Sequence, residues 1–254
     1  MVTRRALLIS NPGETADPYY CGGVYVDIRN YQSYLQQPHG GSWAVSEIEH
    51  LDRPSADDVR SHIEDLAAYE YSFVAFSGHG YYCREEEATI LRFRKGQELP
   101  HLDLLDGAQR RTLVVDSCRE AYRERIPLEE ARMMAKYAGH RVPSPQLCRE
   151  AFLRAVASAS RGVIVAHGCA IDETAGDDQT RGGRYTASFL ASANRWADAA
   201  SERSTGGTVR TLSVVETHDA AAVETKRRSG GTQNPTIEKP RTELSYFPFA
   251  VFAD

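Results

Sequence analysis

The feature that most restricts the fold is an apolar run that stops at a histidine set between two glycines. Residues Tyr71–Gly80 read Tyr-Ser-Phe-Val-Ala-Phe-Ser-Gly-His-Gly, and the stretch Phe73–Phe76 contains no polar side chain. A short apolar run bounded by turn residues is typical of a strand buried on both faces, as in a parallel sheet. The imidazole of His79 is therefore expected at the carboxyl edge of a sheet, where open α/β folds hold their ligands.

A second segment repeats this design. Arg111–Cys118 reads Arg-Thr-Leu-Val-Val-Asp-Ser-Cys, so its apolar part ends in Asp116, Ser117 and a thiol. If the two predicted strands are neighbours, His79 and Cys118 meet above the same edge of the sheet. A thiol is a strong nucleophile only as the thiolate, and a nearby imidazole can shift that equilibrium and later deliver a proton. We therefore take this pair as the candidate for the chemistry.

The rest of the chain alternates between strand and helix patterns, which is typical of an α/β fold. Further strands are expected over residues 6–10, 43–50, 161–167 and 244–252, and helices over 24–35, 55–67, 146–157, 185–200 and 208–225. Pro248 lacks an amide donor and predicts an edge or a bulge in the last strand. The basic, turn-rich residues 227–240 predict a mobile connection. The expected fold is a mostly parallel sheet of about six strands with helices on both faces.

The composition offers no reason to propose nucleic acid or a membrane as a partner. The net charge is −5, and no span of about 18 apolar residues occurs. The five cysteines are scattered without a Cys-x-x-Cys pair, which fits reduced thiols in the cytosol better than disulfides or a zinc site. We expect the 254 residues to form a single domain in the cytosol.

The two strand endings resemble the motifs of the caspase and metacaspase family of cysteine peptidases. One strand closes with Ser77–Gly80 and the next with Asp116–Cys118, and the resemblance extends over residues 6–200, including Asp27 in the first predicted helix. It implies a caspase-like three-layer sandwich in one peptidase domain. The large-subunit-like part would be residues 1–118, the linker or insertion 119–160 and the small-subunit-like part 161–254.

The same resemblance implies a cysteine endopeptidase with a Cys-His dyad. Cys118 would attack the peptide carbonyl and His79 would serve the leaving amine, and the family requires no third catalytic residue. Amide hydrolysis also needs a group that stabilises the developing oxyanion. Gly80 has no side chain, so its backbone N–H can approach the carbonyl. Together with the N–H of Cys118 it would form an oxyanion hole, in which one donor is typically worth about 3 kcal/mol.

Charge predicts the specificity. Caspases that cut after aspartate line their pocket with arginines, whereas metacaspases that cut after arginine or lysine use acids. Asp116 matches the metacaspase acid and Ser77 a pocket hydroxyl, and Asp27 or Asp17 would supply a second acid. A carboxylate in a partly dry pocket binds a guanidinium through a charge-assisted bidentate contact. We expect cleavage after arginine, with lysine second; in the alternative interpretation Asp116 caps a backbone turn.

Several alternatives stay open from sequence alone. Cys169 is a rival nucleophile because it also follows a buried strand and lies near His167. A histidine among glycines can also be structural. The chain would then be a catalytically inactive caspase-like module that binds a partner. A caspase-like peptidase with aspartate specificity is a further alternative.

The segment 119–160 carries several arginines and a lysine, so an enzyme with an acidic pocket can cut itself there; an intact helical insertion is the alternative.

We expect no cofactor. Many metacaspases need calcium, but position 125, seven residues after Cys118, is an arginine, so the sequence does not support calcium activation. Activation by another protease or a regulator is the alternative. Pro248 disfavours pairing of edge strands, so we expect a monomer that acts on protein or peptide substrates.

Overall fold

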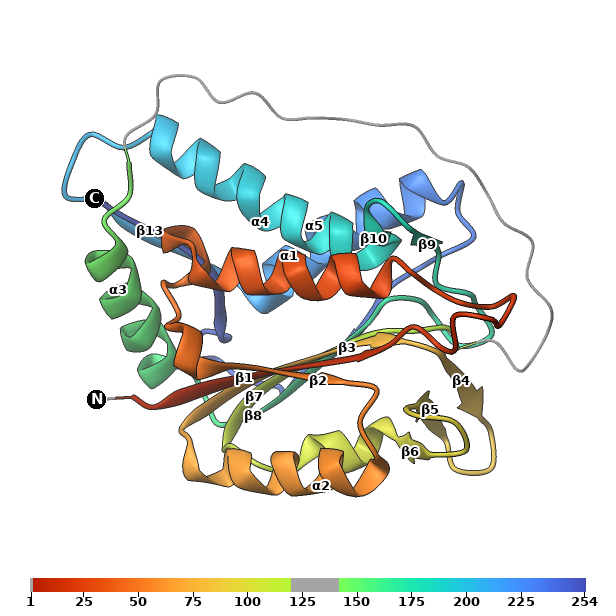
Figure 1. Ribbon diagram of the computed structural model, residues 1–254. Coiled ribbons are helices and arrows are strands. Elements are labelled where there is room, and N and C mark those ends of the chain that lie inside the picture. Colours follow the sequence, from red (N-terminus) through yellow and green to blue (C-terminus); the bar gives the residue numbers. More distant parts are fainter. Residues whose placement is uncertain (1, 120–141) are drawn as a thin grey trace.

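A six-stranded sheet forms the centre of the molecule (Figure 1). The computed structural model describes residues 2–119 and 142–254. The strands of this sheet are β1 Arg4–Asn11, β2 Ile48–Asp52, β3 Tyr71–Gly78, β7 Arg110–Asp116, β8 Gly162–His167 and β12 Thr236–Glu238. Their order is β12-β8-β7-β3-β1-β2, and neighbouring strands are parallel except β12, which is antiparallel to β8. The predicted mostly parallel sheet is confirmed.

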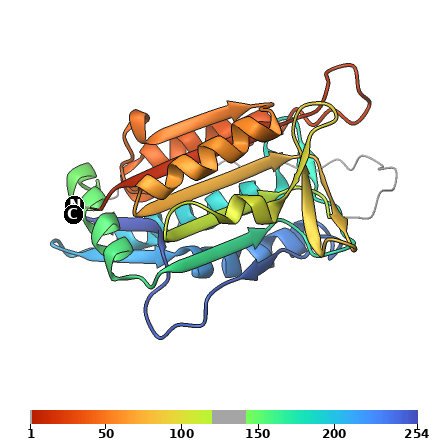
Figure 2. The same ribbon diagram turned by 90° about the horizontal axis from the view of Figure 1, so that it is seen from below.

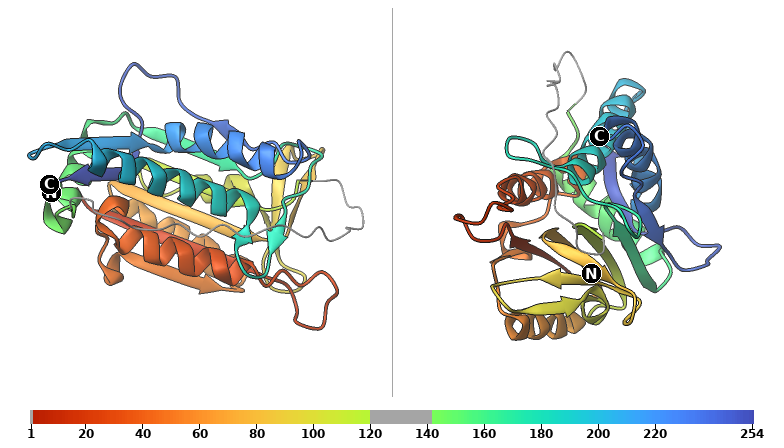
Figure 3. Two further views of the ribbon diagram at one scale, coloured as in Figure 1. Left: turned by 90° about the horizontal axis from the view of Figure 1, so that it is seen from above. Right: turned by 90° about the vertical axis from the view of Figure 1, so that its right-hand side faces the viewer.

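Helices cover both faces of the sheet. They are α1 Val24–Gln36, α2 Ala56–Asp65, α3 Pro145–Ser158, α4 Arg184–Glu202 and α5 Val214–Arg228. One face carries α1, α4 and α5 (Figure 3, left), and the other carries α2 and the 3-10 helix His101–Leu105 (Figure 2). Helix α3 lies at the end of the sheet where both termini are found (Figure 1). The arrangement is the expected α/β sandwich. Within the described residues no helix is both long and apolar enough to cross a membrane.

Three small antiparallel sheets extend this sandwich. Their strands are β4 Gly80–Cys83, β5 Ala88–Arg92 and β6 Glu98–Pro100 in one, β9 Asp177–Asp178 and β10 Gly182–Gly183 in the second, and β11 Val209–Ser213 and β13 Pro248–Ala253 in the third. The first two lie at the end of the sheet opposite the termini (Figure 1). That end is the carboxyl edge of the parallel strands, so the two small sheets flank the predicted site.

The apolar run in β3 is continuous because both of its faces are buried. Phe73 and Ala75 pack into the core beneath α1 and α4, whereas Val74 and Phe76 pack into the core beside α2. Burying one such large apolar side chain contributes roughly 1.5–3 kcal/mol. A parallel strand between two helical layers therefore shows no alternation of polar and apolar residues, as observed for this segment of the sequence.

Three expectations differ from the structure. Residues 208–225 are not one helix, since β11 occupies the first part and pairs with β13. Ser213 and Glu216 form a capping box at the start of α5, a local signal that marks the true beginning of this helix. The strand expected over 43–50 begins only at Ile48, and residues 227–240, expected as a mobile connection, supply β12.

Pro248 was expected at a sheet edge or a bulge. It begins β13 opposite an irregularity between Leu212 and Ser213, which fits a residue without an amide donor. The edge of the central sheet beside β8 is formed by β12 instead. Pro248 therefore does not lie at that edge, and the monomer stays a prediction.

Candidate active site

The register of β3 and β7 brings the two predicted motifs to one edge of the sheet. These strands are parallel neighbours, and Ser77 lies opposite Asp116. His79 follows Ser77 by two residues, and Cys118 follows Asp116 by two residues. Both side chains line one pocket. Its lining residues are Cys21, Val24, Asp27, Ser77, Gly78, His79, Asp116, Cys118, Ala175, Gly176, Asp177 and Gly183. The pocket thus contains two thiols, an imidazole and several carboxylates.

The imidazole is oriented by a backbone carbonyl. His79 Nε2 lies 3.1 Å from the carbonyl oxygen of Pro12, in the turn that follows β1. A carbonyl oxygen only accepts, so Nε2 donates its hydrogen, and in the neutral ring Nδ1 carries the lone pair. Sequence reasoning found no third group beside His79, because a backbone carbonyl has no side-chain signature.

The side chain of Asn11 braces this turn. Asn11 Nδ2 donates to the carbonyl oxygen of Arg92 at 2.8 Å, and Asn11 Oδ1 accepts from the backbone N–H of Gly13 at 3.2 Å. The asparagine is buried at the end of β1. These two bonds hold the Asn11-Pro12-Gly13 turn, and with it the carbonyl that contacts His79.

Of the two candidate thiols, only one reaches the pocket. Cys118 is half-buried, and its Sγ accepts a hydrogen bond from the backbone N–H of Ala175 at 3.3 Å. Cys169 is fully buried, and its Sγ lies 3.3 Å from the carbonyl oxygen of Ser117 and 3.4 Å from that of Glu173. Burial, together with the negative charge of Asp116, raises the pKa of the Cys169 thiol to about 12. A buried thiol that stays protonated is a poor nucleophile.

Gly80 lies against the residue that precedes Cys118. A Cβ atom on Gly80 would come within 2.7 Å of Ser117 Oγ and 2.9 Å of the carbonyl oxygen of Ile90. Only a residue without a side chain allows this approach. Gly80 is not itself a lining residue of the pocket, but its backbone packs beside the turn that carries the thiol.

Two buried carboxylates line the pocket. Asp27, on α1, accepts hydrogen bonds from Ser77 Oγ at 2.6 Å and from the backbone N–H of Gly183 at 2.9 Å. Asp116, at the end of β7, accepts through Oδ2 from the N–H and the hydroxyl of Thr186, at 2.9 and 2.8 Å. The polar groups that hold these acids therefore come from two parts of the chain, the end of β3 and the start of α4.

The two acids face each other across Gly183. A Cβ atom there would lie 2.3 Å from Asp116 Oδ2 and 3.1 Å from Asp27 Oδ2, so the glycine leaves the space between them open. Burial, and then the charge of Asp116, raise the pKa of Asp27 well above its usual range. Two like charges in a dry site favour a cationic ligand.

The choice between Asp17 and Asp27 is decided by position. Asp17 Oδ1 accepts from the N–H of Tyr19 in an exposed loop, and Asp17 is not a lining residue of the pocket. Asp177 was not expected; it lines the pocket from the β9–β10 hairpin, and its Oδ2 accepts from the N–H of Gly23 at 3.3 Å. Neither contact is visible in the sequence, because the partners are backbone groups far apart in the chain.

One group of side chains in the described residues has the composition of a metal site. Ligand atoms of His101, His167 and Glu238 lie within 4.8 Å of one another. However, His101 Nδ1 accepts the N–H of Thr89, so a neutral ring has its hydrogen on Nε2 and no lone pair left for a metal. Burial and the charge of Arg119 lower the pKa of both histidines, and that cation also repels a metal ion. We assign no metal to this group.

Comparisons with known proteins agree with the fold. The family model of the caspase domain of peptidase family C14 matches residues 3–246. None of the curated proteins matches the chain. Among solved structures, caspase-1 from Spodoptera frugiperda is similar, with a TM-score of 0.59 and 14% sequence identity over 97% of this chain and 92% of that one. Because the family model covers nearly the whole chain, this protein belongs to the caspase-domain peptidases of family C14.

Proposed function

We propose that this protein is a cysteine endopeptidase that cleaves peptide bonds after arginine, with lysine as the second choice. Membership of a peptidase family supports proteolysis in general. The observation that carries the finer proposal is the pocket itself, because a half-buried thiol, an imidazole and two buried carboxylates line it together. The thiol and the ring supply the chemistry, and the carboxylates supply the specificity.

In the proposed reaction the thiol of Cys118 gives its proton to His79, and the thiolate attacks the scissile carbonyl carbon. The oxyanion that forms accepts hydrogen bonds from the backbone N–H groups of Gly80 and Cys118. His79 then protonates the leaving amine as the C–N bond breaks, which leaves a thioester on Cys118. A water molecule, deprotonated by His79, hydrolyses the thioester and restores the thiol. In the steps in which His79 is protonated, the carbonyl of Pro12 stabilises the imidazolium by accepting its Nε2 hydrogen.

The pocket charges support basic specificity. A guanidinium offers five N–H donors in one plane and can contact Asp27 and Asp116 together, whereas an ammonium offers a single compact charge. An aspartyl side chain would bring a third carboxylate beside two buried ones. The acids that line the pocket therefore disfavour aspartate specificity.

Self-processing within 119–160 remains part of the proposal. Arg119 is buried, and its side chain donates to Thr89 Oγ1, while Arg149 lies in α3 and pairs with Glu47. Both are poor cleavage sites because a protease needs an extended, accessible backbone. The other basic residues that the sequence suggested, from 123 to 141, lie outside the described residues, and cleavage is expected among them.

The test compares wild type with Cys118→Ala and Cys169→Ala on arginyl, lysyl and aspartyl fluorogenic peptides, with and without calcium. We expect arginyl turnover by wild type and Cys169→Ala, and none by Cys118→Ala. Mass analysis of the purified chains reports self-cleavage. If the protein is instead an inactive binding module, we expect no hydrolysis and no labelling of Cys118 by an arginyl electrophile. Turnover of aspartyl peptides alone would contradict the proposed specificity.

A further inference from the structure

The first turn of α4 holds both acids of the pocket. The N–H of Gly183, the residue before the helix, donates to Asp27, and Thr186 donates both its N–H and its hydroxyl to Asp116. The two acids come from α1 and β7, so the start of α4 links three elements. Asp116 Oδ2 receives both bonds from a single residue, Thr186.

These bonds are suited to stabilising a carboxylate. The N–H groups of the first helical turn have no partner within the helix, and the positive end of the helix dipole favours an anion there. Thr186 is fully buried and Asp116 almost so, and hydrogen bonds to a charged group are strongest where water is excluded. The hydroxyl of Thr186 has one hydrogen, and Asp116 receives it.

We propose that Thr186 is a positioning residue for substrate specificity, whose hydroxyl keeps Asp116 ionised and in a single orientation to receive a basic side chain of the substrate. This inference rests on the proposed function. Thr186 is not a lining residue of the pocket and acts through Asp116. Its loss should weaken binding of the arginyl side chain and leave the chemistry at Cys118 and His79 unchanged.

The proposal also predicts a shift with pH. Removing a donor from the ionised carboxylate raises the apparent pKa of the acid pair. As the pH is lowered, the variant therefore protonates its acids, and loses arginine binding, at a higher pH than wild type does. The titratable groups whose charge acts on Asp116 are Asp27 and Tyr31 on α1, Cys169 after β8 and Tyr185 on α4. The pKa values of the thiol and both phenols are raised, so these groups stay neutral. The limb is set by the carboxyl groups of the pocket, which include Asp177, whose charge also raises the pKa of Asp27.

The experiment uses Thr186→Val, which removes the hydroxyl and keeps the shape, and Thr186→Ser, which restores the hydroxyl. Thr225→Val is the matched control, because Thr225 is also a fully buried helical threonine but its hydroxyl has no hydrogen-bond partner among the described residues. Each variant is assayed for kcat and KM on arginyl peptides from pH 5 to 9. Binding of an arginyl peptide is also measured by calorimetry in the Cys118→Ala background, so that affinity is known without turnover.

We expect Thr186→Val to raise KM and the dissociation constant about tenfold at neutral pH with kcat nearly unchanged, and to move the acid limb of 1/KM to higher pH. Thr186→Ser and Thr225→Val should behave as wild type. If Thr186→Val does not fold, Thr186→Ala replaces it, because the smaller side chain relieves any crowding and also lacks the hydroxyl.

Two results would overturn the inference. If the hydroxyl-free variants keep the wild-type KM, affinity and pH limb, Thr186 does not position the acid. If they lower kcat and melting temperature without changing KM, its role is structural only. Wild type that neither cleaves nor binds arginyl peptides would instead refute the proposed function, and this inference with it.

Discussion

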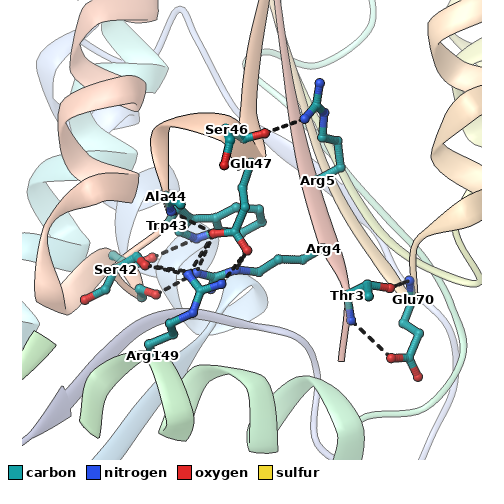
Figure 4. Close-up of polar contacts among 12 residues, drawn as sticks. Thr3, Arg4, Arg5, Ser42, Trp43, Ala44, Ser46, Glu47, Glu70 and Arg149 are labelled. Carbon is teal, nitrogen blue, oxygen red and sulfur yellow. Dashed lines mark hydrogen bonds and ion pairs between the residues drawn. The ribbon is translucent and has the colours of Figure 1, made fainter. Parts of the chain in front are cut away.

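Buried charge occurs at both ends of the sheet, but the two sites are built in opposite ways. At the carboxyl edge Asp27 and Asp116 bring like charges together. At the other end Glu47 lies between Arg149, 2.6 Å away, and Arg4, 3.3 Å away, so opposite charges alternate (Figure 4). We call Arg4, Glu47 and Arg149 the Glu47 cluster.

The Glu47 cluster joins elements distant in sequence. Arg4 begins β1, Glu47 precedes β2 and Arg149 lies on α3, and the guanidinium carbon of Arg4 sits 4.0 Å from the centre of the Trp43 ring. Burial alone would raise the pKa of Glu47, but the hydrogen bonds from Arg149 and Ala44 and the charge of Arg4 lower it to about 2. The carboxylate is thus held ionised by its partners.

The difference indicates what each site is for. In the Glu47 cluster the protein supplies both signs of charge, and the result is a structural link. At the carboxyl edge burial, and then the charge of Asp116, raise the pKa of Asp27, so this acid lowers the stability of the native state at neutral pH. Strain of this kind is typical of functional sites, where activity and stability are opposed.

The largest expected effect separates the two sites by activity. Asp116→Asn removes the charge that we propose to face the substrate and should lower kcat/KM for arginyl peptides by roughly 100-fold or more, because truncating one member of a buried charge pair costs about 2–5 kcal/mol. The melting temperature should not fall. Retained arginyl turnover in a folded Asp116→Asn protein would contradict the specificity proposed for this pocket.

The next effect distinguishes the Glu47 cluster from the acid pair by stability. Glu47→Gln leaves the buried guanidinium of Arg4 without its counter-charge and should reduce the free energy of unfolding by about 3 kcal/mol. The kcat of the folded variant should match wild type. Glu49→Gln is the matched control, since it breaks the more exposed pair with Arg5 and should cost at most about 1 kcal/mol. Denaturant unfolding measures the free energy of unfolding of both variants. Equal losses in Glu47→Gln and Glu49→Gln would contradict a special structural role of the Glu47 cluster.

A third change tests the support of the imidazole that we propose to be catalytic. Asn11→Ala frees the turn whose carbonyl, from Pro12, accepts the hydrogen of His79, and should lower kcat about tenfold, the equivalent of one hydrogen bond of about 1.4 kcal/mol. KM and the preference for arginine over lysine should not change. An altered preference would mean that Asn11 acts on the acids rather than on the imidazole.

A fourth change should stabilise the protein. Asp27→Asn removes one of two like charges while keeping the size of the side chain, and Ser77 can reverse its hydroxyl to accept from the new amide. We expect a gain of about 1 kcal/mol in the free energy of unfolding at pH 7, accompanied by weaker arginyl binding. Loss of stability would show that the hydrogen bonds to Asp27 outweigh its repulsion by Asp116.

The smallest effect is a pH dependence of opposite sign at the two sites. The folded-state pKa of Asp27 is raised, so its unfavourable contribution to the stability of the native state is relieved as the pH falls through that pKa. The difference in melting temperature between wild type and Asp27→Asn should therefore become smaller at acidic pH. The folded-state pKa of Glu47 is lowered to about 2, so its contribution is full above the usual 4.5 and lost as the pH falls toward 2. Melting temperatures of both variants and wild type between pH 7 and pH 3 test the two signs.

Local patterns were sufficient to predict the two strands that carry the proposed catalytic residues. The apolar runs that end near His79 and Cys118 predicted two buried strands, and the structure shows that β3 and β7 are parallel neighbours. Ser55 and Asp58 form a local capping box at the start of α2. Local signals were not enough where pairing partners are distant. Strand β12 is short and polar, and it is a strand only because β8 offers it an open edge.

The sequence by itself determined which residue types stand at the ends of β3 and β7, because the period of apolar residues and the turn that follows are local properties. Only the tertiary structure decided that Cys118 and not Cys169 faces the pocket, that Asp27 and not Asp17 joins Asp116, and that Thr186 holds this acid. Burial and hydrogen bonding depend on segments that meet in space, and several of these contacts involve backbone N–H or C=O groups, which every residue carries. No residue pattern therefore distinguishes them until the chain is folded.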